Sequence, residues 1–163
     1  MSHQKHLWFS LAALATLPLL LVDARLRAAR TGYQPRTPIL VSRDLLPSSL
    51  AIATNSHCSV CLSSLEFYRT LAGLRIVWIA TAESEDATSG FLQKGGVDTL
   101  TVLSARAVAL PINGTPTVFA IDEDRHVARI WIGRLDREAQ IDVLAHMSRV
   151  RSLMKLLHLE HRV

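Results

Sequence analysis

The sequence predicts a single α/β domain with a mixed sheet flanked by helices. Strand-like and helix-like segments alternate through the first part of the body, and this alternation favours parallel strands joined by helices. Two strand-like runs near the end are separated only by a short polar turn, which adds an antiparallel hairpin. The 163 residues, 49% hydrophobic and 20% charged, are enough for one buried core and too apolar for a disordered chain.

Six short runs that are dense in apolar and branched residues are the predicted strands. We expect the first run to lie at an edge of the sheet and the second to be buried. The polar residues 122–125 form the turn between the last two runs. The predicted strands span residues 38–42, 50–54, 75–81, 99–104, 116–121 and 127–132.

Three helices are predicted from apolar residues at helical spacing and from signals at the helix ends. The first opens at residues 56–58 and ends near Gly73. The second covers residues 84–94, with acids in its first turn and Lys94 at its end. The third is long and begins at Asp136. The predicted buried faces are Leu62, Leu65, Phe67 or Tyr68, Leu71 and Ala72 in the first helix, and Ile141, Leu144, Met147, Val150, Met154 and Leu157 in the third.

An uncharged run of 16 residues, 7–22, lies near the start of the chain. It is slightly shorter than a membrane-spanning helix and slightly longer than the apolar part of a secretory signal. We therefore interpret residues 1–26 as an N-terminal hydrophobic helix, either a signal-anchor or a signal peptide cleaved after Ala24. A buried core helix is the third interpretation. Residues 27–37 are predicted to be a linker, and residues 38–163 the folded domain with a long C-terminal helix.

The formal net charge of +4 comes entirely from the first 36 residues. They carry five Lys or Arg against Asp23, whereas residues 37–163 carry 13 charges of each sign. A nucleic-acid-binding domain has its basic surface on the folded part, so the neutral body argues against DNA or RNA as a partner. Four arginines follow the hydrophobic run, and the positive-inside rule taken alone would place the body in the cytoplasm.

Cys58 and Cys61 are the two cysteines of the chain, in a C-x-x-C spacing between a predicted strand and a predicted helix. The free N–H groups and the positive dipole end of a helix stabilise a thiolate at the first cysteine. We expect Cys58 to attack a substrate disulfide and Cys61, one turn later, to resolve the mixed disulfide. Half of a zinc site and a structural cysteine pair are the alternatives. The sequence has no second C-x-x-C and no downstream histidine pair at zinc-finger spacing.

The segment Gly114-Thr115-Pro116-Thr117 leads into the apolar run 118–121, an aspartate, a polar turn, a second strand and Gly133. Together with the preceding C-x-x-C pair, this order resembles the thioredoxin superfamily, most closely its membrane-tethered, extracytoplasmic TlpA-like branch. The resemblance covers about residues 38–148 and implies a thioredoxin-like fold. It also implies that Pro116 is a cis proline beside the cysteine pair and that the backbone of Thr115 binds a substrate strand.

The resemblance further implies a function and a location. It predicts a thiol–disulfide oxidoreductase that reduces or isomerises disulfides of exported proteins, such as apocytochromes, without a small-molecule cofactor. The expected partners are these client proteins, a redox protein that recharges the cysteine pair, and the membrane through the N-terminal helix. The domain would face the periplasm or exterior of a bacterial cytoplasmic membrane, or be soluble in the periplasm after cleavage. This location conflicts with the positive-inside rule.

The sequence departs from the family at three places near the cysteines. His57 stands where the family usually has Trp, and Ser59-Val60 replaces the frequent Gly-Pro or Glu-Pro between the cysteines. The strand 50–54 also lacks the acid that thioredoxins bury there to move the proton of the second cysteine. Resolution through Cys61 would then be slower or depend on water.

His57 has three interpretations. As an imidazolium it would favour the Cys58 thiolate and make the pair more oxidising. As a neutral ring it would join Cys58 and Cys61 in a Cu(I) or Zn(II) site, so a metal chaperone is an alternative function. In the third interpretation His57 is a partly exposed cap residue without a chemical role. A redox-inactive docking module is a further alternative for the protein as a whole.

Overall fold

The computed structural model describes residues 32–99 and 101–160, with side chains as far as Arg149. The predicted hydrophobic helix 1–26 lies outside the described residues. No helix in the described part of the chain is long and apolar enough to cross a membrane. In chain order, the described elements are β1 (Ser49–Thr54), α2 (Ser59–Thr70), β2 (Ile76–Ala80), α3 (Glu85–Lys94), β3 (Val102–Ser104), β4 (Thr117–Ile121), β5 (Val127–Ile132) and α4 (Arg137–Glu160).

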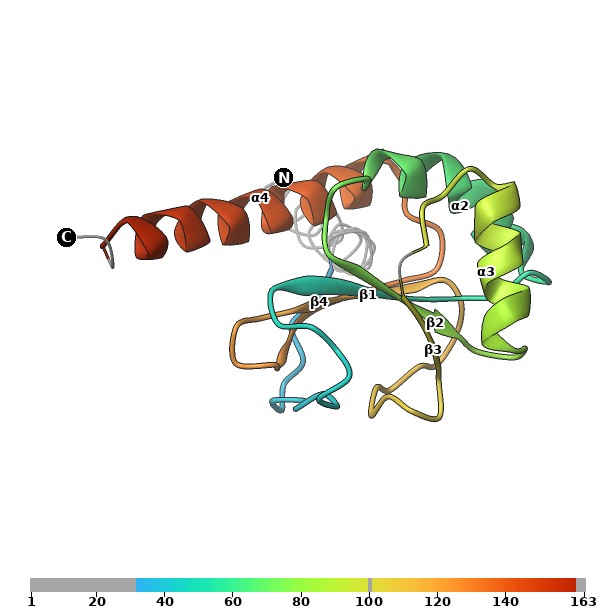
Figure 1. The fold of residues 1–163 in the computed structure, drawn as a ribbon, viewed down its shortest axis with the longest axis horizontal. Helices are drawn as coiled ribbons and strands as arrows, with labels where there is room; N and C mark the ends of the chain where they lie inside the picture. The colour runs from blue at the N-terminus through green and yellow to red at the C-terminus, as the bar shows by residue number, and fades with distance from the viewer. Residues whose placement is uncertain (1–31, 100, 161–163) are drawn as a thin grey trace, which may run out of the picture.

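The strands form one mixed sheet in the order β3-β2-β1-β4-β5 (Figure 1). Strands β1, β2 and β3 are parallel, since α2 and α3 return the chain to the same end of the sheet. Strands β4 and β5 form a hairpin, and β4 runs antiparallel to β1. The predicted parallel core with an added hairpin is therefore confirmed. Because β4 is reversed, its first residue, Thr117, lies beside Ala53 near the end of β1.

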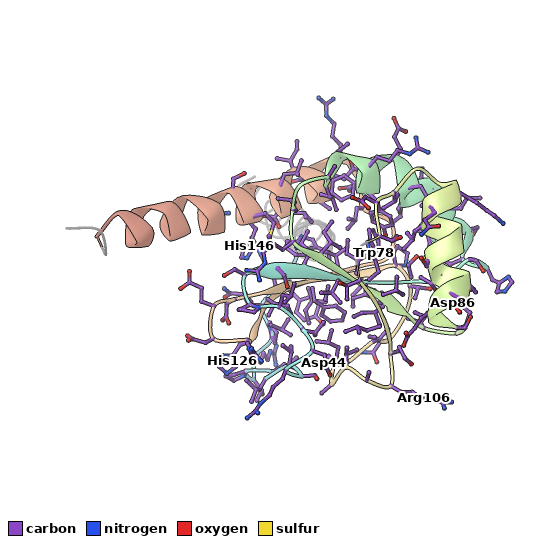
Figure 2. The ribbon with its side chains drawn as sticks, viewed as in Figure 1. Asp44, Trp78, Asp86, Arg106, His126 and His146 are labelled. Carbon is purple, nitrogen blue, oxygen red and sulfur yellow. The ribbon has the colours of Figure 1, made fainter. Side chains whose placement is uncertain are left out.

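Helices α2, α3 and α4 lie on one side of the sheet, and irregular segments lie on the other (Figure 1). Side chains alternate along a strand, so β1 contributes to both faces. Leu50 and Ile52 pack in the core under the helices, and Ala51 and Ala53 pack in the opposite core. Figure 2 shows Trp78 in the layer between the helices and the sheet. The cysteine motif therefore begins a helix that rests directly on the central strand.

The segment before β1 runs along the outer side of β5. Tyr33 and Ile130 exchange both backbone hydrogen bonds at 2.9 Å, and Leu40 forms a single bridge with His126. The predicted strand 38–42 lies at the edge of the sheet as expected, but its pairing is limited to this single bridge. A turn follows directly, in which the Leu45 N–H donates to the Ser42 carbonyl at 3.1 Å.

The buried face of α2 differs in part from the predicted one. Leu65 and Leu71 are buried as expected, but Leu62 is 60% exposed. Ala72 lies beyond the end of the helix and is exposed. The face that meets the sheet is instead the one that carries Cys61. As a result, the second cysteine points into the core.

Helix α4 also packs on the sheet with a different face from the predicted one. Met147 is buried as expected, but Ile141 and Leu144 are 58% and 38% exposed. Ala139 and Val143 are buried in their place, four residues apart and on the same face as Met147. Small side chains at these positions let the helix lie close to the sheet. The C-terminal part of α4 extends beyond the sheet edge (Figure 1), and the predicted Val150, Met154 and Leu157 contacts lie outside the described side chains.

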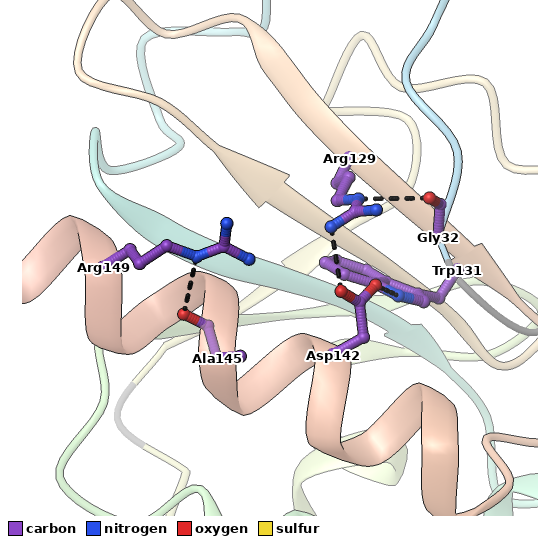
Figure 3. A network of polar contacts seen from close by, with 6 residues as sticks. All are labelled: Gly32, Arg129, Trp131, Asp142, Ala145 and Arg149. Carbon is purple, nitrogen blue, oxygen red and sulfur yellow. Dashed lines mark hydrogen bonds and ion pairs between the residues drawn. The ribbon is translucent and has the colours of Figure 1, made fainter.

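A polar network joins α4, β5 and the first described residue (Figure 3). Asp142 accepts hydrogen bonds from Arg129 Nη1 at 2.9 Å and from Trp131 Nε1 at 3.0 Å. Arg129 Nε also donates to the Gly32 carbonyl at 3.1 Å. Gly32 lies against the Trp131 indole, and a Cβ atom at this position would come within 2.4 Å of the ring. Only glycine therefore fits at this contact.

Candidate active site

Helix α2 starts at Ser59, and Cys58 is its N-cap residue with an extended backbone. The predicted start at residues 56–58 is too early, because Ser56 and His57 belong to the loop between β1 and the cap. Cys58 Sγ accepts a hydrogen bond from the Cys61 N–H at 3.1 Å, the contact that a capping side chain makes with the third helical residue. Both cysteines are free thiols; Cys58 is partly exposed and Cys61 is buried.

The two thiols have pKa values that are shifted in opposite directions. Burial opposes the Cys58 thiolate, but hydrogen bonds with the side chains of Cys61 and Thr115 and with backbone N–H groups of the first turn outweigh it, so the pKa of Cys58 is lowered. Burial is the largest influence on Cys61 and raises the pKa of its thiol. The accessible sulfur is therefore the one that ionises first, as a nucleophile requires.

The loop before β4 lies directly against Cys58. The Thr115–Pro116 peptide bond is cis, in agreement with the resemblance, and Pro116 is buried. The Cys58 thiol donates to the Thr115 carbonyl at 3.4 Å. The Gly133 N–H donates to the Pro116 carbonyl at 2.7 Å and ties this loop to the end of β5. The structure thus brings Cys58, Cys61, Thr115 and Pro116 to one place.

Asn55 was not among the predicted site residues, yet it connects three segments of the site. Its side-chain amide donates to Thr81 Oγ1 and to Thr115 Oγ1, both at 3.2 Å. Its carbonyl oxygen accepts the His57 N–H at 3.0 Å. Asn55 therefore holds the loop before Cys58 against the ends of β2 and of the Pro116 loop.

Glu83 is a second residue that the motifs did not indicate. Its carboxylate accepts hydrogen bonds from the Ser56 N–H at 2.8 Å, from the Ser56 hydroxyl and from Thr88 Oγ1 at 2.6 Å. Burial works against the carboxylate, but these hydrogen bonds and the charge of nearby His57 lower the pKa of Glu83. The ionised Glu83 therefore fixes the loop at Ser56.

His57 lies apart from the buried cysteine. Its side chain is exposed on the loop, whereas Cys61 is buried under the helix. Within the described ranges, no three His, Cys, Asp or Glu side chains form a group that could hold a metal ion. The alternative ligand set of Cys58, Cys61 and His57 stays a prediction. The proposed influence of His57 on the Cys58 thiolate stays a prediction.

A sequence signal for Asn55 and Glu83 existed, although it was weak. Asn55 directly follows β1, and Glu83 comes three residues after β2. The carboxyl ends of neighbouring parallel strands meet at one edge of a sheet, where functional residues of α/β proteins gather. Polar residues at both strand ends were therefore candidates for a shared site.

Comparison with known proteins identifies the fold. No protein-family model and no curated protein matches the chain. A thio-disulfide isomerase from Thermus thermophilus has 18% sequence identity and a TM-score of 0.50, over 72% of this chain and 96% of that one. A putative thioredoxin from Neisseria meningitidis has 13% identity and a TM-score of 0.50, over 73% and 91% of the two chains. The chain therefore has a thioredoxin-like fold.

Proposed function

We propose that this protein is a thiol–disulfide oxidoreductase that acts through Cys58 and Cys61. The observation that carries the proposal is the position of Cys58, a partly exposed thiol at a helix N-terminus with a lowered pKa, 3.4 Å from the Thr115 carbonyl beside cis Pro116. The two similar structures, described as a thio-disulfide isomerase and a putative thioredoxin, support the same chemistry.

The reaction follows from the positions of the two sulfurs. The Cys58 thiolate attacks one sulfur of a client disulfide, a mixed disulfide forms, and the other client sulfur leaves as a thiolate. Cys61 then loses its proton and attacks Cys58 Sγ, which forms the Cys58–Cys61 disulfide and releases the second client thiolate. The two protons of the protein thiols end on the client, which becomes a dithiol. A redox partner must reduce the protein again.

We also propose the TlpA-like, extracytoplasmic setting for this activity. The uncharged run 7–22 would anchor the domain or export it, and exported proteins such as apocytochromes would be the clients. This proposal is supported by the sequence resemblance. A C-terminal alkaline phosphatase fusion should be active, because that reporter folds only outside the cytoplasm. Activity of a reporter that works only in the cytoplasm would contradict the proposed location.

The activity is tested with single cysteine variants of the full-length chain. Cys58→Ser should abolish dithiol-dependent reduction of a protein disulfide, and Cys61→Ser should accumulate a mixed disulfide with the client. Ser63→Ala, an exposed position on α2 outside the C-x-x-C motif, is the matched control and should keep the wild-type rate. Unchanged turnover in Cys58→Ser, or a cysteine pair that stays in one state across glutathione potentials, would favour a redox-inactive docking module instead.

A further inference from the structure

The second cysteine has to lose its proton in a place that water does not reach. Cys61 is fully buried, and burial raises the pKa of its thiol. The strand under it, β1, carries no acidic residue that could stabilise or accept charge. A thiolate at Cys61 therefore needs a hydrogen-bond donor from the protein itself.

Thr54 is placed under the first turn of α2 by the register of β1. Side chains two residues apart on a strand share a face. Leu50 and Ile52 pack in the core beneath α2, so Thr54, the last residue of β1, continues the same face. Both Thr54 and Cys61 are fully buried. The hydroxyl of Thr54 is the polar group that β1 presents to this part of the helix.

The Thr54 hydroxyl is not engaged elsewhere. Its Oγ1 is buried and has no hydrogen-bond partner within the part of the chain that the structure describes. The neighbouring Thr81 hydroxyl donates to the Thr54 carbonyl at 3.2 Å and leaves Oγ1 free. A buried hydroxyl without a partner is unfavourable, and it gains a strong partner when a sulfur beside it ionises.

We infer that the Thr54 hydroxyl donates a hydrogen bond to the Cys61 thiolate while Cys61 resolves the mixed disulfide. The inference rests on the proposed function and adds to it the residue that replaces the missing acid. A hydrogen bond from Thr54 lowers the pKa of Cys61, in the direction opposite to burial. Because Thr54 keeps its proton, the proton of Cys61 passes to the departing client thiolate. The sulfur–sulfur bond to the client breaks as the Cys58–Cys61 bond forms.

Tyr68 provides a comparison within the same core. Its hydroxyl is the other buried side-chain oxygen of the described residues that lacks a partner. Ser64, one turn earlier on α2, donates to the Val60 carbonyl instead. Tyr68 lies two turns from Cys61, and burial raises the pKa of its phenol, so it stays neutral. Removal of this hydroxyl controls for the general effect of deleting an unpaired polar atom under α2.

The experiment separates the two steps of the reaction with dithiobis(nitrobenzoate). The reduced full-length chain, kept in mild detergent, releases one coloured thiolate when Cys58 attacks and a second when Cys61 resolves the mixed disulfide. Thr54→Val keeps the shape of the side chain without its hydroxyl. We expect the first release to stay at the wild-type rate and the second to slow by about tenfold, the effect of one hydrogen bond to a charged group.

Two further variants define the outcome. Thr54→Ser restores the hydroxyl and should restore most of the second rate, while Tyr68→Phe should leave both rates unchanged. Equal second rates in Thr54→Val and wild type, or equal slowing in Tyr68→Phe, would overturn the role of Thr54. If wild type released only the first thiolate, the proposed function itself would fail, so the two failures are distinguishable.

Discussion

Replacing Asn55 by alanine removes the side chain that connects the Cys58 loop to two neighbouring segments. Three hydrogen bonds are lost, those to Thr81, Thr115 and the His57 N–H, with lengths of 3.2, 3.2 and 3.0 Å. Asn55 is only 9% exposed, so water replaces these bonds poorly. The loop before Cys58 should therefore become less stable in the variant.

The size of the effect follows from the number of bonds. A buried hydrogen bond contributes about 1 kcal/mol net, so the three bonds of Asn55 correspond to about 3 kcal/mol of the free energy of unfolding. With a urea m-value of about 2 kcal/mol per molar, the unfolding midpoint should fall by about 1.5 M. This is a large share of the roughly 5–15 kcal/mol by which domains are stable.

Urea unfolding followed by tryptophan fluorescence measures this change, because Trp78 and Trp131 are both buried. Alkylation of Cys58 at neutral pH should also slow, since the Thr115 side chain, which lowers the pKa of Cys58, is no longer held in place by Asn55. Asn113→Ala, an exposed asparagine in the Pro116 loop, is the matched control and should behave as wild type. An unchanged urea midpoint in Asn55→Ala would refute the reasoning.

Two more predictions concern Glu83 and the face of α4. The folded-state pKa of Glu83 is lowered, so its stabilising effect is present above the unfolded-state pKa of about 4.3 and is lost as the pH falls through the folded-state value. Urea titrations measure this from pH 7 down to a pH below the folded-state pKa of Glu83. The free energy of unfolding should fall more for wild type than for Glu83→Gln, and equal losses would contradict the role of the carboxylate. Val143→Ala should reduce the free energy of unfolding by about 2 kcal/mol, because it opens a cavity under α4. Ile141→Ala, at a site that is 58% exposed, should change the free energy of unfolding by less than about 0.5 kcal/mol. A larger loss in Ile141→Ala than in Val143→Ala would instead support the buried face predicted from the sequence.

The central strands of the sheet could be predicted because they are buried on both faces. The runs that become β1 and β2 are apolar almost throughout, as strands with covered faces are. The run 38–42 is equally apolar, but its side chains do not determine how far backbone pairing continues. The Ser42–Leu45 turn ends that pairing, and it depends on local hydrogen bonds rather than on hydropathy.

The helix faces were predicted less well because both helices carry apolar residues on more than one side. In α4, Ile141 and Leu144 are larger and more apolar than Ala139, and hydropathy therefore favours the wrong face. The choice depends on how closely the helix must approach β5, where Asp142 has to reach Arg129 and Trp131. This requirement is visible in the tertiary contacts of α4 and not in its sequence.

In the candidate site, the residues of short motifs could be predicted, and those whose partners are distant in sequence could not. Cys58, Cys61 and Pro116 belong to short motifs whose chemistry follows from spacing and position. Asn55 and Glu83 act on partners 26 to 60 residues away, and a motif does not include such distances. A metal site would require the side chains of His57, Cys58 and Cys61 to converge in space, and closeness in sequence does not determine this.

The bridges at Tyr33 and Leu40 also affect how separate molecules meet. An open sheet edge pairs readily with a strand of another chain and so promotes aggregation. Here the segment before β1 occupies the outer side of β5, and the opposite edge strand, β3, has only three residues. Both edges of the sheet therefore leave little free backbone to which a strand of another chain could add.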